Sequence, residues 1–174
     1  SIRRQRQMCI RDRYIDGQGR AIGGVVVGKR RYVNDLRTFA RHSGPALSPF
    51  NAWTFSRSLE TLAVRMHRHS ENAARLADFL ADHPDVEYVR YPHHPSHPQY
   101  ELAKKQMAMG GGIVTCVVRG GVERGRRFID ALEHFSLTAN LGDVRSIATH
   151  PASTTHSSLS EDQRRAAGIL PGLV

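Results

Sequence analysis

A long amphipathic stretch in the middle of the chain, from Ser48 to Pro84, constrains the fold more than any other feature. It begins as a helix should, because the Ser48 hydroxyl can cap free backbone N–H groups and proline at the next position loses no hydrogen bond. Between Leu59 and Asp82 the apolar residues recur at spacings of three, four and seven, which places them on one helix face. They are Leu59, Leu62, Met66, Ala73, Leu76, Ala77 and Leu80. This pattern predicts a spine that joins two structural units, with a break or kink near Arg57–Ser58.

Strand and helix patterns alternate on both sides of this spine. Before it, the β-branched run at 22–28 predicts a buried strand, and 32–42 predicts a helix. After it, we expect strands at 86–91, 113–118 and 135–139, and helices at 101–109, 122–134 and 158–168. In the last of these, Ser160 and Gln163 form a capping-box pattern and Gly168 is a stop signal. The alternation predicts an α/β chain whose second part is a small sheet covered by helices on one face.

The net charge of +9 is unevenly distributed along the chain. Residues 1–13 hold five arginines and one aspartate, which gives +4 and leaves +5 for the other 161 residues. A basic tail attached to an ordinary domain fits this distribution better than a nucleic-acid-binding surface. We expect residues 1–13 to be a non-native leader; a disordered basic arm and a phosphate-binding arm are the alternatives. We also expect the small domain to be cut off at Val174.

The cysteines and histidines form no pattern that predicts a metal site. Cys9 and Cys116 form no metal-binding or disulfide pattern, so we expect a cytoplasmic protein in which Cys116 is a small core residue. The histidines of the 92–100 loop alternate with prolines and lack a nearby carboxylate or thiol, which favours a solvated loop over a metal centre. No apolar run reaches the length of a membrane-spanning helix, so no membrane partner is expected.

Residues 140–156 (NLGDVRSIATHPASTTH) are rich in hydroxyls, histidines and turn formers and contain few large apolar residues. Such a composition predicts a loop that presents polar groups to a ligand.

Several ordered sequence blocks resemble one known family. They are YIDGQGRAIGG (14–24), GPALSPFNAW (44–53), SLETLAVRMHRHSENA (58–73), YPHHPSHPQYELAKKQM (91–107), LGDVRSIATHPASTTH (141–156) and AAGILPGLV (166–174). From Tyr14 to Val174 the chain is similar to the pyridoxal-phosphate enzymes of cysteine and methionine metabolism. Within that family the first and fifth blocks are most similar to the O-succinylhomoserine sulfhydrylases. The O-acetylhomoserine sulfhydrylases and the cystathionine γ-synthases and lyases are the alternatives.

The resemblance implies a fold of the aspartate-aminotransferase type (fold type I) and a homotetramer. Residues 14–57 would form the C-terminal end of the large cofactor domain, and 58–174 the truncated small domain. The implied reaction is a γ-replacement, in which O-succinyl-L-homoserine and sulfide give L-homocysteine and succinate. Pyridoxal 5′-phosphate would supply the electron sink in the full-length enzyme. Amino-acid substrate and sulfide are the implied partners, and nucleic acid is not.

The resemblance also implies roles for single residues. The family's cofactor lysine immediately precedes the tyrosine matched by Tyr14, but here that position is Arg13, whose guanidinium stays protonated and cannot form the imine. The chain as written is therefore expected to have no catalytic residue and to be inactive. Ser146 matches the residue that faces the substrate carboxylate, and Thr155 matches a threonine near the lysine; the alternative for both is an ordinary loop hydroxyl that caps a turn.

Three further positions bear on the resemblance. His150 and His156 are interpreted as holding the loop through backbone hydrogen bonds, because the lysine would already transfer protons. Ser58 stands where much of the family has glycine. Since glycine costs about 1 kcal/mol in a helix interior, serine here favours a continuous helix.

Overall fold

The computed structural model describes residues 7–9 and 13–174, and the chain divides into two compact units, the first ending at Leu62 and the second spanning Ala63–Val174. Residues 1–6 and 10–12, which make up most of the expected leader, lie outside the described residues. The domain boundary assigned at residues 57 and 58 stays a prediction.

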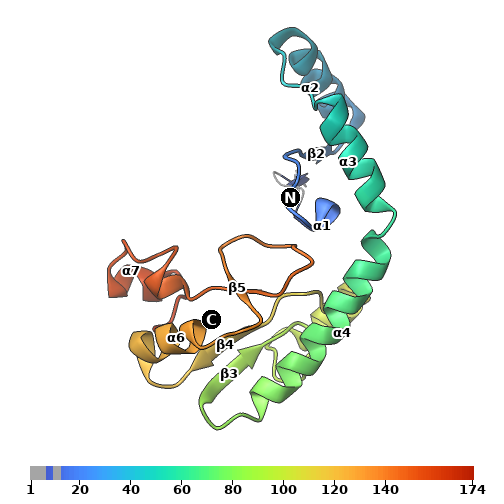
Figure 1. Cartoon of the computed structure of the whole chain (residues 1–174). Coiled ribbons are helices and arrows are strands. Elements are labelled where there is room, and N and C mark those ends of the chain that lie inside the picture. Colours follow the sequence, from blue (N-terminus) through green and yellow to red (C-terminus); the bar gives the residue numbers. More distant parts are fainter. Residues whose placement is uncertain (1–6, 10–12) are drawn as a thin grey trace. The chain divides into compact units, whose positions relative to one another are not determined.

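Residues 7–9 and 13–61 of the first unit form one small sheet and three helices (Figure 1). Strands β1 (Gln7–Cys9) and β2 (Val25–Val27) pair antiparallel, and the helices are α1 (Arg13–Asp16), α2 (Arg30–Ser43) and α3 (Pro49–Leu59). Helix α2 ends at Gly44, whose φ of 87° is the left-handed conformation that glycine adopts most easily. The predicted cap of α3 is confirmed, since the Ser48 hydroxyl accepts a hydrogen bond of 3.1 Å from the Asn51 N–H.

The expectation of a buried strand at 22–28 is wrong in one respect. A strand forms at Val25–Val27, but all three valines are exposed, with Val27 at 64%. The sheet has only two strands, and among residues 7–9 and 13–62 nothing packs against it closely enough to bury these side chains. A β-branched run therefore predicted the strand correctly and its burial incorrectly.

The predicted spine consists of two helices. Helix α3 ends at Leu59 and α4 spans Leu62–Ala81, so the break lies at Glu60–Thr61, and Ser58 is helical. The Ser58 carbonyl accepts hydrogen bonds from the Thr61 N–H at 3.3 Å and from the Thr61 hydroxyl at 3.2 Å. The bond from the Thr61 N–H to the Ser58 carbonyl spans three residues, as in a 3₁₀ helix, instead of the four that an α-helical bond spans. Such a bond tightens the last turn of an α-helix, and α3 ends here. The expected break near Arg57–Ser58 is thus placed too early, and the continuous helix that serine at position 58 favoured does not form.

The second unit is organised around a short antiparallel sheet against which α4 packs (Figure 1). Strand β3 (Val86–Arg90) pairs with β4 (Thr115–Val118), and Gly172–Val174 pair with β4 as a further short strand. Backbone bonds of 2.9 Å join Cys116 and Val174 in both directions. The buried cluster between helix and sheet consists of Ala73, Ala77, Leu80, Val86, Val89, Tyr91, Cys116 and Val118. The predicted apolar face is therefore confirmed over the second half of the spine.

Cys116 lies in this core, as expected. Its side chain is buried, and burial raises the pKa of the thiol to about 11. Tyr91 is also buried, and its hydroxyl lies within hydrogen-bond distance of the Ser70 and Gly111 carbonyl oxygens, at 3.1 and 3.0 Å.

The remaining elements are α5 (Tyr100–Gln106), α6 (Gly121–Asp130), β5 (Ser136–Leu137), β6 (Ile147–Ala148), the 3₁₀ helix η1 (Pro151–Ser153) and α7 (Glu161–Ala166). The capping box of α7 is confirmed, with bonds of 3.2 Å from the Gln163 N–H to the Ser160 hydroxyl and 2.9 Å from the Ser160 N–H to the Gln163 side chain. Residues 140–156 are not all loop, because β6 pairs in parallel with β5. Two residues are too few to show a strand period in the sequence.

Candidate functional site

The turn that carries position 13 is the helical turn α1 of the first unit. Arg13 is exposed and begins the turn, and Tyr14 beside it is half-buried. Burial raises the pKa of the Tyr14 hydroxyl, and the neighbouring Arg13 charge opposes this rise. Asp16 ends the turn, and its side chain is fully buried.

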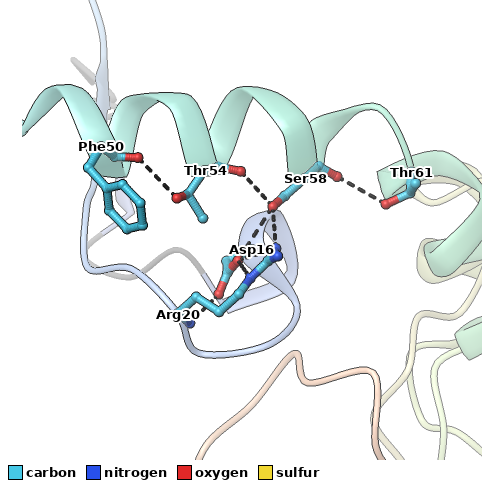
Figure 2. Close-up of polar contacts among 6 residues, drawn as sticks. All are labelled: Asp16, Arg20, Phe50, Thr54, Ser58 and Thr61. Carbon is cyan, nitrogen blue, oxygen red and sulfur yellow. Dashed lines mark hydrogen bonds and ion pairs between the residues drawn. The ribbon is translucent and has the colours of Figure 1, made fainter.

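The Asp16 carboxylate organises the loop that follows (Figure 2). It accepts hydrogen bonds from the Arg20 backbone N–H and, at 2.9 Å, from Arg20 Nε; Arg20 Nη2 lies 2.8 Å away. Gly17 and Gly19 have φ values of 73° and 67°, which allow the backbone to curl around the carboxylate. Burial would raise the pKa of Asp16, but the bonds from the Arg20 backbone and side chain outweigh it and hold that pKa below its usual value.

Ser58 joins this loop to helix α3. Its hydroxyl donates to the Thr54 carbonyl at 2.7 Å, accepts from Arg20 Nη2 at 2.7 Å, and lies 3.4 Å from Asp16 Oδ1 (Figure 2). These contacts connect residues 38 and 42 positions apart in the chain. The turn that carries position 13 is therefore tied to α3 by a polar cluster of Asp16, Arg20 and Ser58.

Replacing Ser58 by glycine is expected to destabilise the first unit by about 2 kcal/mol. About 1 kcal/mol comes from the flexibility of glycine in a helix, and the rest from the lost bonds to Arg20 and Asp16. Ser58→Ala should cost about 1 kcal/mol, since it removes only the hydroxyl. Urea unfolding followed by the fluorescence of Trp53, the only tryptophan, measures both. Equal losses for the two variants would contradict the helix contribution.

The second unit places Ser146 immediately before β6. Ser146 is exposed, and its carbonyl accepts a hydrogen bond of 2.9 Å from the Ser136 N–H at the start of β5. The short parallel pair β5–β6 thus fixes the backbone at this residue. Thr155 is also exposed, and its hydroxyl lies 2.8 Å from His156 Nδ1. Within residues 63–174, no side-chain bond joins Ser146 to Thr155.

The interpretation of His150 is confirmed. The ring is fully buried, and Nε2 lies 2.7 Å from the Pro171 carbonyl oxygen while Nδ1 lies 2.8 Å from the Ser153 hydroxyl. Because a carbonyl oxygen only accepts hydrogen bonds, Nε2 carries the proton. His150 thus connects η1 to Pro171, the residue before the Gly172–Val174 segment that pairs with β4. His156 differs from the expectation, since its ring contacts the Thr155 hydroxyl instead of the backbone.

Two charged residues before Ser146 were not singled out by the sequence. Asp143 Oδ1 accepts from the Arg145 N–H at 2.9 Å and Arg145 Nε at 3.1 Å, and Oδ2 accepts from Arg145 Nη2 at 2.9 Å. The side-chain bond from Arg145 is the largest of the causes that hold the pKa of Asp143 below its usual value. In the sequence, the only signal for this ion pair was an aspartate two residues before an arginine, and such a pair of residues is common on protein surfaces.

Two kinds of site find no support in the described part of the chain. Residues 7–9 and 13–174 contain no group of three or more His, Cys, Asp or Glu side chains arranged to hold a metal ion. In the same residues no helix is both long and apolar enough to cross a lipid bilayer.

Comparison with known proteins identifies the family. The sequence pattern of the family described as "Cys/Met metabolism PLP-dependent enzyme" matches residues 11–174. The chain belongs to this family. The O-succinylhomoserine sulfhydrylase of Pseudomonas aeruginosa is 48% identical over 162 residues, which are 93% of this chain and 40% of the relative. The O-acetyl-L-homoserine sulfhydrylase of Leptospira meyeri is 50% identical over 136 residues, covering 77% of this chain and 31% of the relative.

The fold matches solved members of the family. The crystal structure of cystathionine γ-synthase from Xanthomonas oryzae pv. oryzae, in complex with aminoacrylate and cysteine, superposes with a TM-score of 0.87 at 36% identity. The match covers 95% of this chain and 43% of that enzyme. The fold is thus that of the pyridoxal-phosphate enzymes of fold type I. This chain spans about two fifths of the length of the curated relatives it matches, 40% for the Pseudomonas enzyme.

Position 13, which the resemblance matches to the family's cofactor lysine, carries a residue that does not fit an imine-bound pyridoxal phosphate. The family depends on this cofactor, but position 13 carries an exposed guanidinium that stays protonated and cannot condense with the aldehyde. The neighbouring Tyr14 and Asp16 lie in a helical turn that the bond from Arg20 to Ser58 ties to α3.

Proposed function

We propose that this chain is part of an enzyme that catalyses γ-replacement on O-succinyl-L-homoserine, with sulfide as the second substrate and L-homocysteine and succinate as products. In this reaction the bond from Cγ to the ester oxygen breaks and a bond from Cγ to sulfur forms. The family match over residues 11–174 carries the proposal, and the similarity to the Pseudomonas sulfhydrylase favours the succinyl ester. The cofactor supplies the electron sink that such a replacement needs.

Within this enzyme, Ser146 would face the α-carboxylate of the substrate and Thr155 would lie near the cofactor lysine. Both hydroxyls are exposed in the second unit, and the backbone of Ser146 is fixed by its bond to Ser136. A donor held by a strand pair is well suited to fix the orientation of a carboxylate.

The chain as written is expected to form no covalent adduct with pyridoxal phosphate at position 13, because arginine has no free amine. Incubation with the cofactor, borohydride reduction and peptide mass spectrometry measure this directly. Arg13→Lys is the matched variant and should gain a reducible adduct on the peptide that contains Tyr14. An adduct at position 13 of the unaltered chain would refute this expectation.

We further propose that residues 1–13 are not native and that lysine precedes Tyr14 in the gene. Resequencing the source DNA upstream of the Tyr14 codon tests this. A lysine codon is expected there. An arginine codon in a continuous reading frame would instead favour a non-catalytic scaffold that retains the small domain.

The activity itself is best tested in a chimera. Residues 14–174 replace the matching segment of the Pseudomonas aeruginosa relative, which supplies the remaining part of the enzyme, with lysine placed before Tyr14. Homocysteine should form from O-succinyl-L-homoserine and sulfide. Ser146→Ala should lower kcat/KM about 10- to 100-fold, the effect of one lost hydrogen bond to a charged group. A folded, cofactor-loaded chimera that forms no homocysteine would refute the proposal, and turnover of the acetyl ester alone would identify the other sulfhydrylase.

The wider setting is proposed from the family resemblance and the composition of the chain. The enzyme would be a cytoplasmic homotetramer that acts in methionine biosynthesis and binds neither nucleic acid nor membranes. Homocysteine formation is the step at which sulfur enters the carbon skeleton of methionine.

A further inference from the structure

Three residues on one face of helix α3 contact the loop that follows α1. Their spacings of four and three residues place their side chains on the same side of the helix. They are Asn51, Phe55 and Ser58. Asn51 Nδ2 donates to the Ile22 carbonyl at 2.9 Å, and a Cβ on Gly23 would collide with the Phe55 ring. These two contacts hold the far end of the loop against α3.

The third contact continues to the backbone of position 13. Ser58 Oγ accepts from Arg20 Nη2 at 2.7 Å, and the same guanidinium bonds the Asp16 carboxylate (Figure 2). Asp16 is followed by Gly17, which is buried. The Gly17 N–H donates to the Arg13 carbonyl at 3.0 Å. A series of bonds therefore runs from α3 through Arg20 and the α1 turn to position 13.

The α1 turn depends on this support. It has only four residues, and a single helical turn is not stable by itself, because helix nucleation is unfavourable. A buried carboxylate paired with a guanidinium adds little net stability, since desolvation offsets the attraction, but its bonds define one geometry. Arg13 is exposed although its carbonyl is held. The cluster is thus suited to orient position 13 and to leave its side chain free to react.

We propose that the bond between Arg20 and Ser58 orients position 13 for the reaction, so that Arg20 and Ser58 are positioning residues of the enzyme. The inference rests on the proposed function, because it takes lysine to occupy position 13 in the gene. A lysine there would transfer protons, and misplacing such a group by about 1 Å can lower a rate about 100-fold. Ser58 is buried, so its hydroxyl acts through Arg20 and the turn and not on the substrate.

Hydrogen exchange in the full 174-residue chain tests whether the bond holds position 13. Ser58→Ala should accelerate exchange of the Gly17 N–H about fivefold, the effect of one lost hydrogen bond. It should leave the Gly44 N–H unchanged, which donates to the Ala40 carbonyl at 3.0 Å in the same unit.

Ser48→Ala is the matched control, because it removes a hydroxyl from the other end of α3 at a similar cost in stability. It should leave the Gly17 exchange unchanged. Equal acceleration of Gly17 in Ser58→Ala and Ser48→Ala would overturn the inference, because Ser58 would then act only through the stability of the unit.

Kinetics of the chimera with lysine at position 13 test the consequence for the reaction. Ser58→Ala should lower kcat about 10-fold and leave KM unchanged, whereas Ser48→Ala should change neither. Arg20→Lys keeps a charge beside Asp16 but lacks the second nitrogen that reaches Ser58, so it should lower kcat similarly. The double variant should lose no more than either single variant, because both remove the same contact.

An unchanged kcat in Ser58→Ala, or additive losses in the double variant, would overturn the inference. If the chimera without these substitutions forms no homocysteine, the proposed function fails. The exchange comparison then decides by itself whether the bond between Arg20 and Ser58 holds position 13.

Discussion

Replacing His150 by alanine is expected to destabilise the second unit by about 3 kcal/mol. The change removes a fully buried ring and leaves the Pro171 carbonyl without its donor at 2.7 Å. The site is also tightly packed, since a Cβ on Gly125 of α6 would collide with the ring, so neighbouring atoms fill the space poorly when it is lost. Denaturant unfolding followed by circular dichroism measures the loss.

The location of this effect can also be measured. The bond between His150 and Pro171 holds the segment that leads to Gly172–Val174, and the Val174 N–H donates to the Cys116 carbonyl at 2.9 Å. Hydrogen exchange at Val174 should therefore accelerate in His150→Ala more than exchange at Val89 in β3. His156→Ala is the matched control, because the hydrogen bond of its ring is made to the exposed Thr155 hydroxyl, and it should cost less than about 0.5 kcal/mol. Similar losses for the two variants would contradict the role assigned to His150.

Asp16→Asn is expected to destabilise the first unit by about 2 kcal/mol at pH 7. The buried carboxylate accepts from both the backbone and the side chain of Arg20, and an amide cannot replace its charge. The expected loss of stability is moderate, because the Arg20 side chain is 49% exposed and its charge can be hydrated when the ion pair is lost. Trp53 fluorescence during urea unfolding reports on this unit.

The loss should depend on pH in a defined direction. Because the pKa of Asp16 is lower in the folded than in the unfolded chain, its contribution is fully present above the unfolded value, about 4, and disappears as the pH falls through the folded value. The difference in stability between the unaltered chain and Asp16→Asn should therefore shrink below about pH 4. Asp35→Asn, at an exposed position on α2, should show neither effect. A difference that grows on acidification would contradict the cluster.

The parts of the fold that could be predicted from the sequence are those with local causes. The caps at Ser48 and Ser160, the apolar face of α4 and the strand β3 all follow from residues within one or two turns of one another. The break at Glu60–Thr61 was placed too early, because it is closed by a bond from Thr61 to Ser58 that no composition rule identifies. The exposure of β2 depends on what packs against it, and sequence patterns do not contain this information.

The candidate site was less predictable than the fold. The resemblance alone singled out Ser146 and Thr155, since a loop hydroxyl has no distinctive pattern. Asp16 and Ser58 are 42 positions apart, and their contact required the fold. Asp143 and Arg145 are close in sequence, but only the structure shows that the carboxylate is nearly buried while its partner is exposed. The buried state of one member is what separates an oriented ion pair from an ordinary surface pair.

The pairing of β4 with Gly172–Val174 has a consequence for how the polypeptide folds during synthesis. Strand β3 meets its partner β4 about 30 residues later, so this strand pair and α4 can assemble while translation continues. The opposite edge of β4 has no partner strand until Val174, 58 residues after Cys116, has been synthesised. Until those residues leave the ribosome, Cys116 and Val118 present unpaired backbone groups that a neighbouring nascent chain can capture. Slowing translation after the Val118 codon should therefore increase aggregation of newly made chains, whereas the same delay after the Val174 codon should not.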